Sequence, residues 1–318
     1  MPQGTPLKVW FVNVGHGNCT IVKFPAGRIM MVDISNSKAF DEDTKAELMK
    51  SAGSGVLGRR FVGLTEIAQK KARLLREMKS YENLLDDPIA DILKTEPSFE
   101  GEDIFRFILS HPDMDHMTGM YGLFEQDKDI DVINFRDTEN MKEKPKKIGP
   151  GYDVRDWDEY QRIRQKESNP AALFLYRGSE GQFYTDDNLS ILSPSLSLKE
   201  ECNKAGDWNN LCYVLKIAHG SSSLLLPGDA EEKAQKQVLD YYGNKLVATI
   251  LKAPHHGRDN GYFSDFVKAV NPDYTIVSVG KKPENDATNK YRQFTKKKVF
   301  STRFMGTIYA ELFCNGAG

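Results

Sequence analysis

The chain has 318 residues, of which 40% are hydrophobic and 28% are charged. This composition provides for a sizeable core, and the length allows about two domains or one large α/β sandwich. The formal net charge is −2, which excludes a global basic field for nucleic acid, so any basic surface must be local.

Three strands are expected at the start of the chain, because apolar residues alternate there and are separated by turns. They cover 7–14, 19–24 and 28–34, and the third ends near Asp33, where the sequence becomes polar. Over 38–93 apolar residues instead recur every three or four positions, with Lys and Arg between them. This spacing predicts helix, and we expect a helical insertion over about 38–100 whose basic residues form a solvated face.

A dense group of candidate metal ligands follows the next expected strand, 104–109. The group consists of His111, Asp113, Asp115 and His116. Pro112 cannot continue the strand, so these residues fall on a loop at its carboxyl end, and a helix is expected from Met117. Imidazole nitrogens and carboxylate oxygens bind Zn²⁺, Mn²⁺ or Fe²⁺, and two carboxylates offset the charge of two dications. Because the chain has only six histidines, a chance acidic loop is the weaker interpretation.

Strands and helices continue to alternate after this loop. A short strand is expected at 131–135, followed by a charged segment, 136–182, that we interpret as a surface insertion near the site with a helix at 153–165. Next come a strand and turn at 183–195 and a hairpin of 208–218 with 222–226, whose tip places His219 in a turn. The remaining expected elements are a helix at 231–242, a strand at 247–253, a helix at 260–270 and strands at 274–279 and 306–313.

Two of the later strands also end at candidate ligands. Asp229 stands in the Pro-Gly-Asp segment after 222–226, and His255 and His256 follow 247–253. Because successive side chains usually point apart, we expect one imidazole to face the metal and the other to support it or meet substrate. Ligand sites in α/β folds lie at such strand exits, so the three exits predict one shared site.

The cysteines and the apolar segments indicate the compartment. Cys19, Cys202, Cys212 and Cys314 are widely spaced and form no CxxC pair, which is typical of reduced thiols. The first residues lack the basic and apolar regions of a secretory signal, and no apolar run approaches 18 residues. The sequence therefore predicts a cytoplasmic protein without membrane contact.

This combination of motifs resembles the metallo-β-lactamase superfamily, and within it the hydrolase domain of ComEC-type competence proteins and their free-standing relatives. The matching segments are FVNVGHGN (11–18), SHPDMDHMTG (110–119), LPGD (226–229), LKAPHHG (251–257) and IVSVG (276–280). Asn18 stands where the family commonly has Asp. The resemblance implies an α/β fold in one domain over 1–318. That fold is an αββα sandwich of two mixed β-sheets packed face to face, with helices outside and a two-metal cleft along one edge.

The resemblance also implies the metal ligands. Those for two divalent ions, zinc or manganese, are His111, Asp113, Asp115, His116, Asp229 and His255. The first two would hold one ion, Asp229 would bridge both, and the others would hold the second ion. Asp113 replaces a family histidine, and Asn209 or Asn210 stands where a further histidine is common. Both changes harden the donor set, which shifts the expectation from two zincs toward manganese or a mixed site.

Catalytic and substrate-binding roles are implied in the same way. Asp115 would orient the attacking water, and His256 or Arg258 would stabilise the charged transition state or the leaving oxygen. Substrate binding is assigned to Asn210, Lys281 and Asn285, although a solvated turn is an equal alternative for the lysine.

The expected function is metal-dependent hydrolysis, in which two metal ions activate water for attack on a phosphodiester. The ComEC-type resemblance implies a nucleic acid or nucleotide as the substrate. Two alternatives stay open: hydrolysis of a lactone, thioester or small phosphate ester at the same site, and a non-catalytic binding module that retains the fold. The intact set of ligands argues against the second, and the sequence indicates neither a protein partner nor an oligomeric state.

Overall fold

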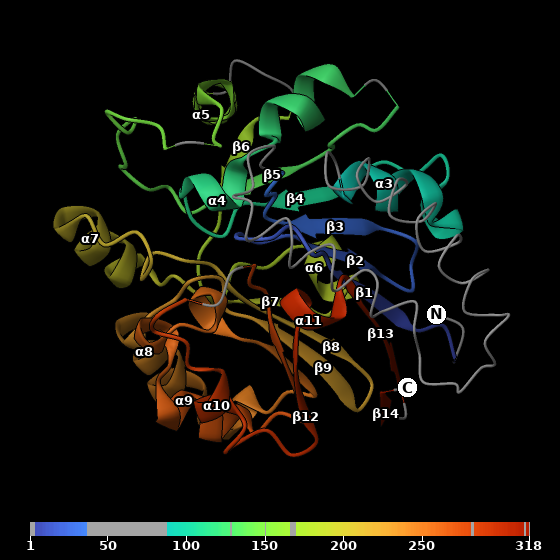
Figure 1. The fold of residues 1–318 in the computed structure, drawn as a ribbon, viewed down its shortest axis with the longest axis vertical. Helices are drawn as coiled ribbons and strands as arrows, with labels where there is room; N and C mark the ends of the chain where they lie inside the picture. The colour runs from blue at the N-terminus through green and yellow to red at the C-terminus, as the bar shows by residue number, and fades with distance from the viewer. Residues whose placement is uncertain are drawn as a thin grey trace, which may run out of the picture.

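The computed structural model describes residues 4–36, 88–127, 129–149, 151–165, 170–280, 283–314 and 316–317. In this part of the chain two mixed β-sheets pack face to face, with helices on their outer faces (Figure 1). This arrangement confirms the two-sheet sandwich expected from the sequence. Most of the expected helical insertion at 38–100 lies outside the described residues.

The first sheet has eight strands in the order β14-β13-β1-β2-β3-β4-β5-β6. Their bounds are β1 (Leu7–Phe11), β2 (Thr20–Lys23), β3 (Ile29–Val32), β4 (Arg106–Ile108), β5 (Phe135–Asp137), β6 (Ala172–Phe174), β13 (Ile308–Phe313) and β14 (Gly316–Ala317). Strands β3, β4, β5 and β6 pair in parallel. Because parallel strands end at the same edge, Asp33 after β3 and the 110–116 loop after β4 come together there.

The second sheet has six strands in the order β12-β11-β10-β9-β8-β7. Their bounds are β7 (Leu189–Ser193), β8 (Val214–His219), β9 (Ser222–Leu226), β10 (Ile250–Lys252), β11 (Tyr274–Val277) and β12 (Lys298–Ser301). Strands β9 to β12 are parallel. Asp229 after β9 and the two histidines after β10 therefore also share an edge, and sheet packing brings this edge against that of the first sheet.

Helices cover the outer face of each sheet. On the first sheet these are α3 (Pro88–Thr95), α4 (Met114–Met117) and α5 (Val154–Arg164), and on the second they are α7 (Leu196–Ala205), α8 (Glu232–Tyr242), α9 (Ser264–Val270) and α10 (Thr288–Tyr291). Two further short helices are α6 (Gln182–Asp186) and α11 (Thr302–Met305). Within the described residues no helix has both the length and the apolar character needed to cross a bilayer.

The alternation of side chains along each strand creates a core in three layers. In β1, Leu7 and Phe11 face the second sheet, whereas Trp10 faces the helices on the outside. All three are buried, and each contributes roughly 2 kcal/mol to the stability of the fold. The inner layer ends beneath the strand exits, so the site lies at the rim of a rigid sandwich.

Several elements differ from the expectations. The segment 136–182 is not only a surface insertion, because it supplies β6 to the first sheet and the buried Trp157 and Tyr160 to the core. The helix expected from Met117 instead begins at Met114, inside the ligand motif. A helix, α6, occupies the start of the segment expected as strand and turn at 183–195. The strands β6 and β12 and the helix α7 were not expected.

Candidate metal centre

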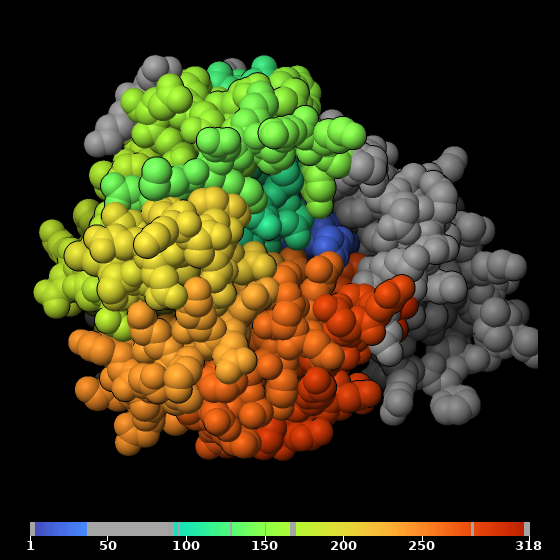
Figure 2. Space-filling model, turned by 90° about the vertical axis from the view of Figure 1, so that its left-hand side faces the viewer, coloured from blue at the N-terminus to red at the C-terminus, as the bar shows by residue number. Residues whose placement is uncertain are grey.

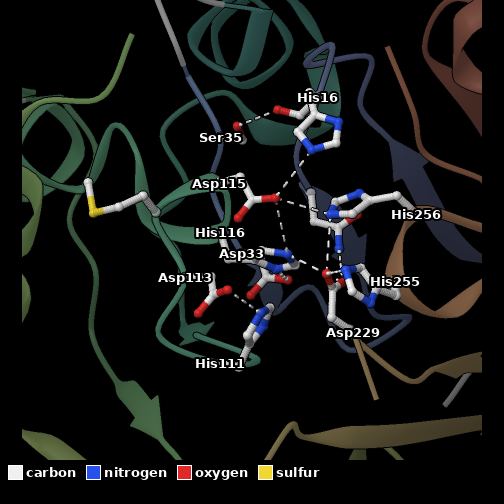
Figure 3. Close-up of polar contacts among 12 residues, drawn as sticks. His16, Asp33, Ser35, His111, Asp113, Asp115, His116, Asp229, His255 and His256 are labelled. Carbon is white, nitrogen blue, oxygen red and sulfur yellow. Dashed lines mark hydrogen bonds and ion pairs between the residues drawn. The ribbon is translucent and has the colours of Figure 1, made fainter. Parts of the chain in front are cut away.

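Four strand exits meet in a hollow on one face of the molecule. Figure 2 shows the blue and teal segments, from the N-terminal strands and the 104–120 region, at its floor between a green wall and an orange wall. The polar side chains of the ligand motifs converge there (Figure 3).

Six candidate ligands form two groups, within each of which the ligand atoms lie within 4.8 Å of one another. One group is His111, His116 and Asp229, and the other is His16, Asp115 and His256. Asp229 connects them, because its Oδ1 lies 3.3 Å from His116 Nε2 and its Oδ2 lies 3.3 Å from His256 Nε2. Asp229 thus has one oxygen beside each group, and it would be the residue that both ions share if both groups held one.

Buried nitrogens in this cluster lack hydrogen bonds. The Nε2 atoms of His111, His116 and His256 have no hydrogen-bond partner in the described part of the chain. A buried polar atom without a partner is costly, and a cation held between these nitrogens and the facing carboxylates would satisfy both. Three imidazoles with shared carboxylates form a donor set for zinc or manganese. The residues present therefore fit a pair of divalent ions.

Asp33 orients the imidazole of His116. Its Oδ2 lies 2.8 Å from His116 Nδ1, and its two oxygens accept hydrogen bonds of 2.7 and 2.9 Å from the backbone N–H and hydroxyl of Ser110. Because a carboxylate only accepts, the proton of the neutral ring is on Nδ1, which leaves Nε2 to face the cluster. Asp33 was expected only to mark the end of a strand, although its position at a strand exit was a usable signal.

A second buried chain of contacts holds Asp229. Asn18 Nδ2 donates to Asp229 Oδ1 over 3.2 Å, and Lys252 Nζ donates to the Asn18 carbonyl oxygen. An ammonium group only donates, so Lys252 fixes which end of the amide faces Asp229. Burial lowers the pKa of Lys252, which is 3% exposed. Asn18 thus donates to Asp229 without adding a further negative charge.

The two adjacent histidines lie on an unusual turn. His255 and His256 have φ of 45° and 54°, in the left-handed region, so the strand rule that successive side chains point apart does not apply. His256 Nε2 lies 3.2 Å from Asp115 Oδ2, and its Nδ1 donates to the Ser278 carbonyl over 3.2 Å. His255 contacts Glu231 at 3.2 Å and lies 3.7 Å from Asp229 Oδ2. The geometry thus favours His256 over the expected His255 as a ligand.

His16 joins the site without having been expected there. It lies on the loop after β1, with Nε2 3.8 Å from Asp115 Oδ2 and 3.0 Å from Arg258 Nη2. Burial, and next the neighbouring His256, lower the pKa of His16 to about 4, so the ring is neutral and its Nε2 accepts from the guanidinium. The glycines on either side of His16 were the sequence signal that the backbone approaches the ligand loop closely here. A Cβ on Gly17, where φ is 135°, would lie 2.6 Å from the Asp115 carbonyl oxygen.

The carboxylates of the cluster increase the proton affinity of the facing imidazoles. Burial would lower the pKa of His116 and of His256, but the facing carboxylates, Asp229 foremost, raise both above the usual value. Burial would likewise raise the pKa of Asp115, yet His116 and His256 lower it. In the metal-free protein the imidazoles therefore hold protons that a bound dication would displace.

The three residues expected to bind substrate lie in different environments. Asn210 donates to Asp207 over 3.0 Å and accepts from the backbone N–H of Ala234 over 2.9 Å, so its amide supports the start of α8. Asn285 is exposed and contacts the 258–259 turn through its backbone oxygen. Lys281 lies outside the described residues. Their substrate-binding roles remain predictions.

Comparisons with known proteins place this geometry in context. No protein-family model matches the chain. Competence protein ComA of Neisseria gonorrhoeae is 31% identical over 91 residues, which are 27% of this chain and 13% of that protein. The uncharacterised protein YcaI of Escherichia coli is 30% identical over 89 residues, or 26% of this chain and 12% of that protein. ComE operon protein 3 of Bacillus subtilis is 26% identical over 174 residues, or 55% of this chain and 20% of that protein.

Solved structures also align over most of the chain. The metallo-β-lactamase fold protein YhfI of Bacillus subtilis aligns with a TM-score of 0.44 and 9% identity, over 95% of this chain and 98% of that one. CmlA of Streptomyces venezuelae, a diiron β-hydroxylase, aligns with a TM-score of 0.45 and 10% identity, over 98% of this chain and 55% of that one. By sequence, the chain spans a fifth or less of each curated relative it matches. It is a distant homologue of the ComA and ComEC-type competence proteins and of YcaI.

Proposed function

We propose that the protein is a metal-dependent hydrolase of phosphodiester bonds that uses two divalent ions, zinc or manganese. The observation that carries this proposal is the placement of Asp229 between two ligand groups whose buried imidazole nitrogens have no hydrogen-bond partner. Ions bound there would lower the pKa of water toward neutrality and offset negative charge on a phosphoryl oxygen.

The side chains around the cluster have the donors and acceptors for such a reaction. Asp115 is partly exposed at 19%, so one of its oxygens can accept a hydrogen bond from an attacking water and orient it at the open side of the cluster. Arg258 stands beside His16 at the same rim and can donate to a charged oxygen. The fixed tautomers of His116 and His256 keep this arrangement preorganised.

The likeness to competence proteins supports a nucleic acid or nucleotide as the substrate, as the sequence resemblance implied. Because the chain matches only a small part of those relatives, the likeness concerns that part alone and not their full activities. Hydrolysis of a lactone, thioester or small phosphate ester is the alternative that the experiment must separate.

The test uses protein loaded with Zn²⁺ or Mn²⁺, with its metal content measured. Cleavage of bis(p-nitrophenyl) phosphate and of single-stranded and double-stranded DNA is compared with cleavage of a lactone panel. The combined Asp115→Ala and His116→Ala variant should abolish turnover, whereas His219→Ala, a histidine at the hairpin tip, should leave turnover intact. Unchanged turnover in the first variant, or cleavage of lactones alone, would reject the phosphodiesterase assignment. Absence of both metal and activity would favour a binding module.

A further inference from the structure

The segment that follows β5 places a lysine, Lys142, at the edge of the metal centre. Lys142 Nζ donates to Asp113 Oδ1, and the other oxygen of this carboxylate lies 3.7 Å from His111 Nε2. The Lys142 side chain is 19% exposed and that of Asp113 is 35% exposed. The ammonium group therefore lies at the rim, one carboxylate away from the first ligand group.

The backbone around Lys142 is anchored on two sides. Asn140 is buried, donates to the Tyr160 hydroxyl over 2.6 Å, and accepts from the Lys142 N–H over 3.1 Å. Asn203 of α7 accepts from the Met141 N–H over 2.8 Å. Lys142 therefore projects from a fixed loop, unlike an ordinary surface lysine, and little backbone ordering remains for ligand binding to require.

Arg258 is a second cation at the rim of the cluster. Arg258 lies beside His16 and the second ligand group, whereas Lys142 lies beside the first. The rim thus has a cation beside each ligand group.

Metal binding would change the net charge that surrounds the Lys142 ammonium group. In the metal-free protein its partner is the negative charge of Asp113, whose pKa is lowered because His111 and Lys142 outweigh its burial. When dications offset the carboxylates of the cluster, the surroundings of the ammonium group change from anionic to cationic. An incoming anion would then interact more favourably with Lys142 than Asp113 does, whereas a neutral ester would gain nothing from it.

We propose that Lys142 binds a non-bridging oxygen of the substrate phosphate, and thereby selects an anionic phosphodiester over a neutral ester. The choice of reaction rests on the proposed function, but the contact between Lys142 and a phosphate anion does not depend on turnover.

The test compares three variants, all assayed with metal content measured. Lys142→Met removes the charge at similar length, Lys142→Arg restores it, and Lys144→Met changes a lysine of the same segment that pairs with Asp158 away from the cluster. We expect Lys142→Met to lower kcat/KM for bis(p-nitrophenyl) phosphate by about 10-fold to 100-fold and to weaken inorganic phosphate binding similarly. Its activity on p-nitrophenyl acetate and its metal content should not change. Lys142→Arg should recover much of the loss, and Lys144→Met should match the wild type.

Several outcomes would overturn the proposal. Equal losses on the charged and neutral substrates, or a loss of metal in Lys142→Met, would mean that Lys142 only positions Asp113. Calorimetry on metal-loaded protein measures phosphate binding directly. Equal affinities in Lys142→Met and Lys144→Met would show that Lys142 does not contact the anion. If the wild type binds metal but cleaves no diester, the proposed function fails on its own. The calorimetric comparison still decides the role of Lys142.

Discussion

The substitution Asp33→Asn tests whether the metal centre depends on the tautomer of His116. The carboxylate accepts from His116 Nδ1 and from both donors of Ser110. An amide can keep one acceptor toward the Ser110 N–H, but its NH₂ then faces His116 Nδ1 and donates to it. The ring proton is thereby moved to Nε2, the atom that lies 3.3 Å from Asp229 and faces the cluster.

The expected magnitude follows from these contacts. To bind metal, the variant must return the proton to Nδ1 and leave a buried donor opposite another donor, which costs about 1–3 kcal/mol. That range corresponds to roughly a 5-fold to 150-fold loss of metal affinity, in line with the 10-fold to 100-fold typical of residues that orient a ligating histidine. The folding cost is of similar size, which a domain of ordinary stability tolerates.

The assay is competition for Zn²⁺ against a chromophoric chelator, together with ¹⁵N NMR of the imidazoles, which reports the tautomer directly. Asp187→Asn serves as the matched control, because Asp187 is a buried carboxylate that accepts from Arg28 and Arg106 instead of from the cluster. It should lose stability and keep its metal affinity. A folded Asp33→Asn protein with unchanged zinc affinity would show that the orientation argument is wrong.

Three further predictions concern the same site. His256→Ala should lose metal more severely than His255→Ala, by tenfold or more in affinity as measured by chelator competition, because only the first removes a nitrogen facing both carboxylates. Zinc affinity should rise with pH until the pH passes the pKa values of His116 and His256, with proton release in calorimetry, because these pKa values are raised in the metal-free protein. By the same linkage, metal-free protein should lose stability as pH rises through those raised values, and metal-loaded protein should not. Gly17→Ala should destabilise the fold by about 2–4 kcal/mol in urea denaturation, because its Cβ would lie 2.2 Å from Ser35 Oγ.

The positions of the ligand motifs could be predicted because they follow from strand direction. The 110–116 loop and Asp229 each follow a buried apolar strand, and parallel pairing places such exits along one edge of a sheet. The short strand β6 could not be predicted in this way, since its three residues, Ala172–Phe174, have no distinctive pattern and become a strand only by pairing with β5. The helix α7 was detectable, because Ser195 accepts from the Leu198 N–H as a normal N-cap.

The pair His255 and His256 shows where pattern reasoning reached its limit. The expectation that one imidazole faces the metal assumed that the strand continued through the pair, but β10 ends at Lys252 and both histidines adopt left-handed backbone. Such a conformation costs a residue with a Cβ roughly 1–2 kcal/mol, so the contacts around it must compensate. The Ser278 carbonyl contacts His256 Nδ1, and the carboxylates of Asp115 and Asp229 lie 3.2 and 3.3 Å from its Nε2. Metal binding at its Nε2 would stabilise the same turn, so removal of the metal would be expected to loosen it.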